Sequence, residues 1–463
     1  MKKFLVLFVA VMLALPAMSY AGSATSRWDL SIGGMVKFDL MYADQAVTPE
    51  VTFAERESGT RESSRDEYGA LTWASGESRL NFLVKGPDTW GAKTSAFIEG
   101  DFRRASVLNM AGGTGGTLAT DAYGPNSSSY GTFGLRHAFM KFDWPTFSLV
   151  MGSTWTLPGA LPCFCLMSVN ELGPFNKSYF IPQIYGVWQA TKAFSISAGA
   201  IAPYDPVKGI SGTTATGIAM DDFARSNWPL FFTEFLWKSD VCGKIGPWML
   251  QFGVGGIYGK EKPITPGSNG SVTSRWTTGS PGTAAGFTAT SYDDDEVDAW
   301  MATFKTYIPI IPEKAPGRLA GSLGLALTAF TSQNMRTLIP PPPMIQSLQS
   351  YDRLPTDADA DFHAPVYTGG WAQLAFYWTD TVWSGFYYGQ GQLSLSHARK
   401  RTVPSSSIER LQHYAVNLVY DPNPAIRLGL EYNYITTHYG ANFAGLKDEG
   451  NVNAIHFGAS YFF

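Results

Sequence analysis

Alternation of apolar and polar residues at every second position is the feature that most constrains how this chain can fold. Between residues 29 and 42, one face carries Leu30, Ile32, Val36, Phe38, Leu40 and Tyr42. The other face carries Asp29, Ser31, Lys37 and Asp39. A helix cannot sort residues with a period of two, whereas a strand points successive side chains to opposite faces. The same period recurs at 426–434, so the sequence predicts an all-β chain.

The alternating segments are joined by connections that are long and short in turn. The predicted strands lie at about 28–43, 78–85, 92–103, 133–143, 146–155, 183–190, 194–203, 228–238, 247–258, 297–308, 318–331, 369–378, 383–397, 409–420, 426–438 and 451–463. Long extracellular loops and short periplasmic turns are typical of a transmembrane antiparallel β-barrel. The pattern therefore predicts 16 strands. A hairpin within 259–296 or 332–368 would make 18.

The amino-terminal residues predict export. Two lysines precede an apolar run from Phe4 to Leu15 that is too short to span a bilayer. Ser19 and Ala21 place small residues where a signal peptidase reads the chain. We predict a cleaved signal peptide at 1–21 and one barrel domain at 22–463, in the outer membrane of a Gram-negative type of envelope.

Composition favours a barrel that faces lipid. Charged residues make up 16% of the chain and aromatic residues 14%, whereas a soluble domain averages about 25% charged residues. A soluble β-sandwich or propeller should carry more polar surface positions. The formal net charge of −4 is also not the basic balance of a nucleic-acid-binding protein.

The last predicted strand carries a further indication. Apolar residues fall at alternate positions and the chain ends on a phenylalanine, with Phe457, Tyr461 and Phe463 on one face. This resembles the signal by which bacterial outer-membrane barrels enter the barrel-assembly machinery. His456 lies on the opposite face. We interpret it as a wall residue and not a metal ligand, because no partner has ligand spacing.

Four strand motifs carry a resemblance to a known family. They read Glu77-Ser78-Arg79-Leu80-Asn81-Phe82, Ile98-Glu99-Gly100-Asp101-Phe102, Leu135-Arg136-His137-Ala138 and Gly152-Ser153-Thr154-Trp155. In this order they resemble the bacterial trimeric porin superfamily, particularly its DcaP-like branch, over about 28–203. The resemblance implies a homotrimer and a loop after the fifth strand that folds inward as the constriction. The presence of Cys163 and Cys165 in that loop departs from a purely polar constriction.

The segment from about 156 to 182 follows the fifth strand in the count made from alternation alone. Its prolines 158, 162, 174 and 182 exclude a helix, and it is too apolar for an ordinary solvated loop. We expect 161–167 to pack on the barrel wall and 170–177 to meet solutes. Cys163 and Cys165 are expected to pack there and not to bind metal, and Cys242 is expected in a periplasmic turn.

Strand alternation also nominates residues that line the pore. It turns Arg79, Lys93, Glu99 and Asp101 inward. We assign Arg136 to the same set, although its strand is ambiguous because His137 and Lys141 share the opposite face. The loop offers Glu171, Asn176 and Lys177 against them. Opposed acids and bases across a constriction would order dipolar solutes and set ion preference. The alternative is that these charges only pair with one another and solvate the wall.

The sequence predicts a passive channel. We find no haem-attachment, metalloprotease, phosphate-loop or nucleophile-elbow motif, and we expect no catalytic residue, metal site or cofactor. We expect an outer-membrane porin for small hydrophilic or charged solutes, surrounded by outer-membrane lipid and lipopolysaccharide and without a nucleic-acid partner. The alternative is a barrel sheath for a multihaem cytochrome in trans-outer-membrane electron transfer. An outer-membrane enzyme ranks last.

Overall fold

The protein is almost entirely β-structure. A computed structural model describes residues 28–45, 53–59, 64–102, 133–159, 161, 175, 180–202, 213–214, 217–218, 228–261, 297–333, 335, 366–394, 408–440 and 445–463. Within these ranges the helical element is α2 (Ser64–Glu67), a single turn. Among the described residues, no helix combines the length and the apolar character needed to cross a membrane.

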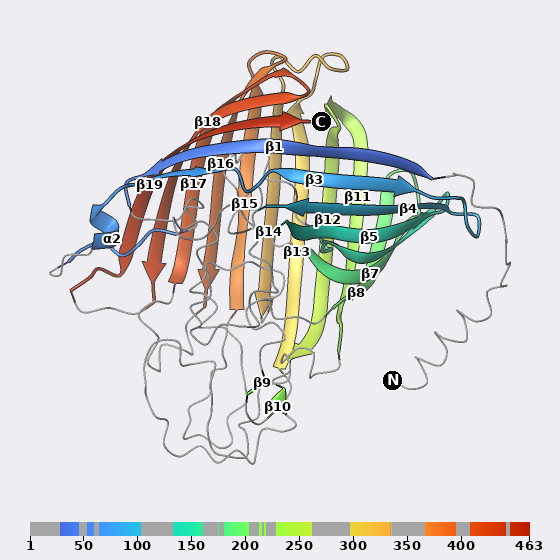
Figure 1. Ribbon diagram of the computed structural model, residues 1–463, viewed down its shortest axis with the longest axis horizontal. Helices are drawn as coiled ribbons and strands as arrows, with labels where there is room; N and C mark the ends of the chain where they lie inside the picture. Colours follow the sequence, from blue (N-terminus) through green and yellow to red (C-terminus); the bar gives the residue numbers. More distant parts are fainter. Residues whose placement is uncertain are drawn as a thin grey trace.

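One antiparallel sheet forms the wall (Figure 1). Its first strands are β1 (Asp29–Ala43), β2 (Ala70–Ala74), β3 (Arg79–Lys85), β4 (Lys93–Asp101), β5 (Gly134–Asp143), β6 (Phe147–Trp155), β7 (Phe180–Gln189) and β8 (Phe194–Ile201). The remaining strands are β11 (Leu230–Ile245), β12 (Trp248–Glu261), β13 (Val297–Ile311), β14 (Leu323–Gln333), β15 (Val366–Tyr377), β16 (Val382–Leu393), β17 (Ile408–Asn423), β18 (Ile426–Tyr439) and β19 (Glu449–Phe462). A separate two-stranded ladder consists of β9 (Thr213–Thr214) and β10 (Gly217–Ile218).

The sheet closes on itself. β1 pairs with β19 from Met35 opposite Phe462 to Ala43 opposite Ala454, so the first and last strands lie side by side (Figure 1). β3 pairs with the first half of β1 and β2 with its second half, so β2 and β3 share one place in the wall. The predicted 16-strand antiparallel barrel is confirmed. The alternative of 18 strands is wrong, because β12 pairs directly with β13 and β14 with β15.

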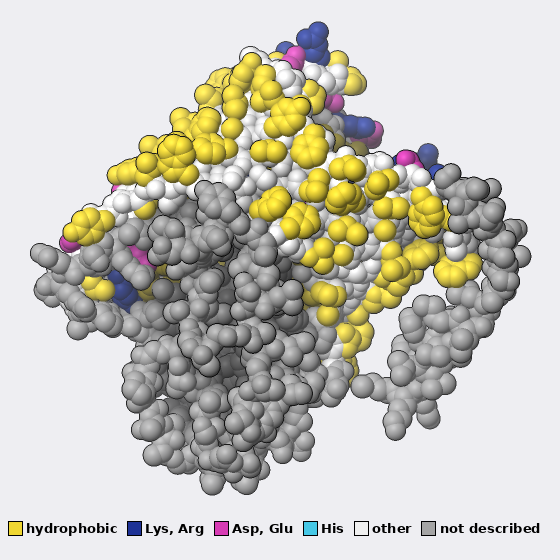
Figure 2. Space-filling view, in the orientation of Figure 1, with side chains coloured by type: hydrophobic (Ala, Val, Ile, Leu, Met, Phe, Trp, Pro, Cys, Tyr) yellow, Lys and Arg dark blue, Asp and Glu magenta, His cyan; other side chains and the backbone are white. Residues whose placement is uncertain are grey.

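The alternation seen in the sequence sorts the two faces of the wall. In β1, Leu30, Ile32 and Val36 are exposed outward, whereas Lys37 and Asp39 are each only 5% exposed on the inner face. Hydrophobic side chains spread over the outer face, with charged side chains at its margins (Figure 2). A hydrophobic outer face and a polar inner face are what a barrel in lipid requires.

The structure corrects two predicted boundaries. β2 lies within 44–77, a stretch that reads as one polar loop because its alternation is only five residues long. Cys242 is not in a turn, because β11 continues to Ile245 and the turn follows at Gly246, which has a φ of 56°. The pairing of β11 with β12 shifts between Ser239 and Lys244. Cys242 lies in that irregularity and is exposed.

The wall is unequal in height. The strands from β3 to β8 contain 7 to 10 residues. The strands from β11 to β19 contain 11 to 16. A strand tilted in a bilayer needs about 9–11 residues to cross it. The stretch from β3 to β8 is therefore the short side of the barrel.

A charge placed on the outer face should cost stability according to its depth. Leu418 pairs with Leu430 and lies on the lipid side of β17, between the exposed Tyr414 and Tyr420 of the same face. Leu418→Arg should reduce the free energy of unfolding by about 2–4 kcal/mol, whereas Gln412→Arg, nearer the extracellular end of the same face, should cost about 0–1 kcal/mol. Urea titration of the protein folded in lipid vesicles measures both. Equal losses at the two positions would contradict the predicted depth.

Candidate pore constriction

A buried ionic cluster lies on the inner face of β4 and β5. Arg136 Nε donates to Glu99 Oε1 at 3.0 Å, and its Nη1 donates to Asp101 Oδ2 at 2.8 Å. Arg136 is 5% exposed and Asp101 is fully buried. The guanidinium also stacks over the Phe180 ring, 4.5 Å from its centroid. Two carboxylates held by one guanidinium in fixed geometry form a rigid, buried ionic cluster.

A β-bulge explains how Arg136 reaches this cluster. His137 pairs with Glu99 and Leu135 with Gly100, so Arg136 is an extra residue without a partner in β4. A bulge places two neighbouring residues opposite one residue of the next strand. Arg136 and His137 therefore both face the lumen, and His137 Nδ1 lies 3.0 Å from Thr154 Oγ1. Strict alternation could not assign this strand because it does not allow for the bulge.

A second ionic cluster joins β1 to β19. Lys37 Nζ contacts the Glu77 carboxylate and lies 3.4 Å from Asp39 Oδ1. His456 Nε2 lies 2.8 Å from the same Asp39 oxygen. His456 is thus a wall residue facing the lumen. Within the described parts of the chain, no group of three or more His, Cys, Asp or Glu side chains is arranged to hold a metal ion.

Loop three, the segment between β6 and β7, contacts the inner wall of β12 and β13 at its first described residues. Gly159 accepts a hydrogen bond from Lys305 Nζ at 3.0 Å, and the same ammonium lies 2.9 Å from Glu234 Oε2. A Cβ built on Gly255 of β12 would lie 2.6 Å from Pro158. The start of the loop is therefore packed against β12 and β13, four and five strands along the wall from β6.

Phe175 fixes loop three at a second place on the wall. It is fully buried. Built Cβ atoms on Gly389 and Gly391 of β16 would lie 2.2 and 3.0 Å from its ring. The two glycines thus form a socket that admits the ring because they lack side chains. Together with Leu161, which is buried in the same hydrophobic cluster, this contact confirms that loop three folds inward.

The residues predicted from alternation do not all lie together. Glu99, Asp101 and Arg136 form one cluster, and Arg79 pairs in register with Asp101 at the extracellular end of β3. Lys93 is exposed at the periplasmic end of β4, opposite Asp143. Phe457, Tyr461 and Phe463 are exposed on the outer face. The remaining predicted residues, Glu171, Asn176 and Lys177, and both loop cysteines, Cys163 and Cys165, lie outside the described residues.

Several charged residues of the inner wall were not predicted. Lys37 and Asp39 stood on the polar face of the first strand, so alternation alone could have identified them. Glu234 and Lys305 lie on strands far apart in the sequence, and only the pairing of β11, β12 and β13 brings them together. Glu77 precedes β3 and reaches Lys37 from a turn, where alternation gives no signal.

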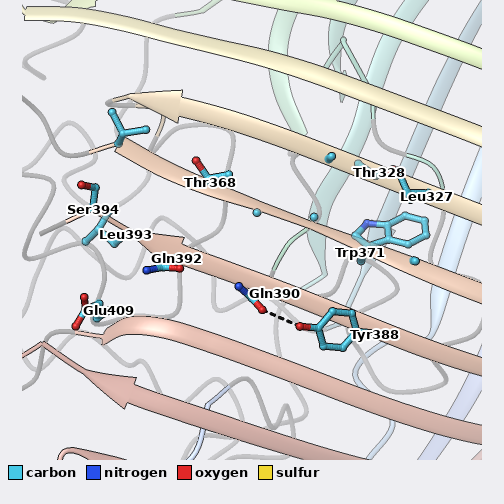
Figure 3. Close-up of a pocket in the computed structure, with 15 residues that line it drawn as sticks. Leu327, Thr328, Thr368, Trp371, Tyr388, Gln390, Gln392, Leu393, Ser394 and Glu409 are labelled. Carbon is cyan, nitrogen blue, oxygen red and sulfur yellow. Dashed lines mark hydrogen bonds between the residues drawn. The ribbon is translucent and has the colours of Figure 1, made fainter.

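A groove of about 750 Å³ lies outside the lumen, on the outer face of β14 to β16 (Figure 3). Thr368, Gln390 and Gln392 line it, and Tyr388 donates a hydrogen bond to Gln390 Oε1 at 2.7 Å (Figure 3). These residues alternate with lumen-facing Tyr387 and Leu393, which are buried. The groove therefore faces away from the pore and is not part of a permeation path.

Comparison with solved structures places this fold among known proteins. The chain is similar to the outer-membrane channel DcaP of Acinetobacter baumannii, with 15% identity over 95% of this chain and 99% of that one and a TM-score of 0.62. It is also similar to an anion-selective porin from Comamonas acidovorans, with 10% identity over 94% of this chain and 100% of that one and a TM-score of 0.52. The chain has the fold of a bacterial outer-membrane porin. No protein-family model matches the sequence of this porin-like barrel, and no curated protein is significantly similar to it in sequence.

Removing Arg136 should leave two buried carboxylates without their cation. We expect Arg136→Met to lower the free energy of unfolding by about 3–5 kcal/mol, as for other broken buried ion pairs. Lys141→Met is the matched control on the same strand. Its ammonium lies 2.8 Å from Asp143 but both side chains are more than a third exposed, so we expect a loss of about 0–1 kcal/mol. Urea titration in lipid vesicles measures the free energy of unfolding of both variants. Equal losses of stability would mean that the Arg136 cluster is solvated.

Proposed function

We propose that this protein is an outer-membrane porin that lets small hydrophilic or charged solutes diffuse passively across the outer membrane. The observation that carries the proposal is loop three, seated on β12 and β13 through Gly159 and on β16 through Phe175. A barrel that only forms a scaffold has no need of a loop fixed across its lumen. A barrel that selects solutes needs such a narrowing.

Selectivity would come from charge on the two sides of the passage. Arg136, Glu99 and Asp101 are held in fixed geometry on one wall. Glu171, Asn176 and Lys177 belong to loop three, and we propose that they face the same passage. Lumen residues tune selectivity in barrels of this kind. The transport is sieving combined with electrostatics, and we propose no catalytic turnover and no cofactor.

The short wall is the surface where we propose that three copies of the chain meet. The strands from β3 to β8 are shorter than those of the rest of the barrel. Their outer face carries the exposed side chains Ile98, Leu135 and Met140. Contact with another barrel would cover these side chains, while β11 to β19 would face outer-membrane lipid and lipopolysaccharide. The exposed outward row Phe457, Tyr461 and Phe463 would serve as the signal to the barrel-assembly machinery after the leader at 1–21 is removed.

The alternative, a sheath around a multihaem cytochrome, needs an open lumen. The buried contacts of Pro158 and Phe175 with the inner wall argue against it. Recording the purified protein in planar bilayers separates the two functions. A porin trimer should open in three equal steps without bound haem. A silent protein that co-purifies with haem would overturn the proposal in favour of the sheath.

A methyl group at Gly255 should disturb the seat of loop three. The built Cβ would lie 2.6 Å from Pro158, whereas at Gly256 the nearest atom is 3.5 Å away. We expect Gly255→Ala to change the single-channel conductance and Gly256→Ala to leave it at the wild-type value, because only the first displaces the loop. Identical conductance in both variants would show that the seat of the loop does not control the passage.

The charges of loop three should set the ion preference. Exchange of the two charges in the double variant Glu171→Lys, Lys177→Glu keeps the net charge but reverses the local field. We expect the reversal potential in a salt gradient to shift, because the electric field across a constriction determines whether cations or anions enter more easily. An unchanged reversal potential would show that these two residues are not the filter.

A further inference from the structure

Residues 53–59 of the first loop lie against the barrel wall. The Ala54 amide donates to Thr437 Oγ1 at 2.8 Å, and Tyr439 Oη donates to the Ala54 carbonyl at 2.7 Å. Ala54 is fully buried, in the same hydrophobic cluster as Ile435 and Val452 of β18 and β19. No sequence pattern indicates this contact, since the segment reads as part of a polar loop.

This contact is on the lumen side of the wall. In β18, Asn433, Ile435 and Thr437 are buried, while Leu430 and Tyr432 are exposed on the lipid side. Thr437 therefore points inward.

Gly450 shows the same placement on β19, where it alternates with the lipid-facing row. A Cβ built on Gly450 would lie only 1.7 Å from the Glu55 carbonyl oxygen. The backbone around Glu55 thus lies flat on the inner face, at a position that admits glycine alone.

The segment is then fixed at the extracellular rim by a short ladder. The Glu57 amide donates to the Glu449 carbonyl at 2.9 Å, and the Lys447 amide donates to the Glu57 carbonyl at 3.0 Å. Lys447 Nζ donates to Glu57 Oε2 and Asn451 Nδ2 to Glu57 Oε1, each at 2.8 Å. The hydrogen bond from Lys447 holds the pKa of the Glu57 carboxyl below its usual range.

Arg56 joins the two parts of this attachment. Its guanidinium stacks over the Tyr439 ring, 4.1 Å from the centroid, and Nη1 donates to the Lys447 carbonyl at 2.8 Å. The side chain is 7% exposed. Beyond the end of β1, the edge of β19 has unpaired backbone groups, and a ladder of backbone hydrogen bonds would be enough to cover it. That purpose accounts for residues 57–59 but not for residues 54–56, which cross the inner face.

We propose that residues 53–59 form a second constriction element of the pore. Loop three covers the inner wall of β12, β13 and β16, and the 53–59 segment covers that of β18 and β19. Each segment occupies part of the width inside the barrel, so solutes would pass through a lumen narrowed from two separate stretches of the wall. This inference rests on the proposed porin function.

Gly450→Ala tests the proposal without changing any charge. Its methyl group cannot coexist with the Glu55 carbonyl, so residues 54–56 must leave the wall. We expect the single-channel conductance to rise and trypsin to cleave after Arg56, a bond that the wild-type protein should protect. Gly256→Ala is the control, since its Cβ meets nothing closer than 3.5 Å.

A second pair of variants covers the case in which Gly450→Ala fails to assemble. Glu57→Gln removes the ion pair with Lys447. Glu449→Gln is the control, because it removes one negative charge from the same rim but at a side chain that faces His438. Faster cleavage after Arg56 and higher conductance in Glu57→Gln alone would support the proposal.

Wild-type conductance in a variant whose Arg56 bond has become cleavable would overturn the inference, because the segment would then be an edge cover outside the path. Protection of Arg56 in every assembled variant would overturn it as well. Absence of any channel in the wild-type protein would instead overturn the porin function itself. The two failures are therefore distinguishable.

Discussion

The structure depends on one constraint, the lack of hydrogen-bonding partners for the backbone inside a bilayer. Hydrocarbon offers nothing to an unpaired amide or carbonyl, so a sheet can cross it only if it closes. Here closure is made by the pairing of β1 with β19, which runs nine residues from Met35 to Ala43. The Phe463 carbonyl extends it by accepting from the Gly34 amide at 2.9 Å. The first and last strands of the barrel therefore pair with each other and close it.

Closure decides where charge can be placed. Because the outer face is apolar, acids and bases turn inward, and those that are buried in the wall need partners. Arg136 with two carboxylates, Lys37 with Glu77 and Lys305 with Glu234 meet this need in three separate places. The same closed wall gives loop segments an apolar surface to pack on. Trp371 and Tyr387 are nearly fully buried, in one cluster with Phe175.

Strand alternation predicted most of the wall because burial and exposure repeat with the same period as the backbone. It also placed the segment 156–182 after the fifth strand. The inward folding of that segment was predicted from its apolar, proline-broken sequence and from the resemblance to the porin superfamily. Strand alternation failed where geometry departs from that period. Alternation with a period of two is interrupted by the bulge at Arg136 and is absent at Glu77, which lies in a turn. In β2 it lasts only five residues, which is too short to identify a strand. Contacts such as Ala54 with Thr437 join residues 383 positions apart, and a single sequence does not encode them in any local pattern.

In the function that we propose, loop segments packed on the inner wall set the size of the passage. The most direct measurement is the swelling rate of liposomes containing the protein in uncharged sugars of increasing size, compared between the wild-type chain and a chain lacking residues 162–174. Uncharged solutes isolate size from charge. The shortened chain should admit larger sugars than the wild-type chain. An identical size limit in two assembled barrels would contradict it.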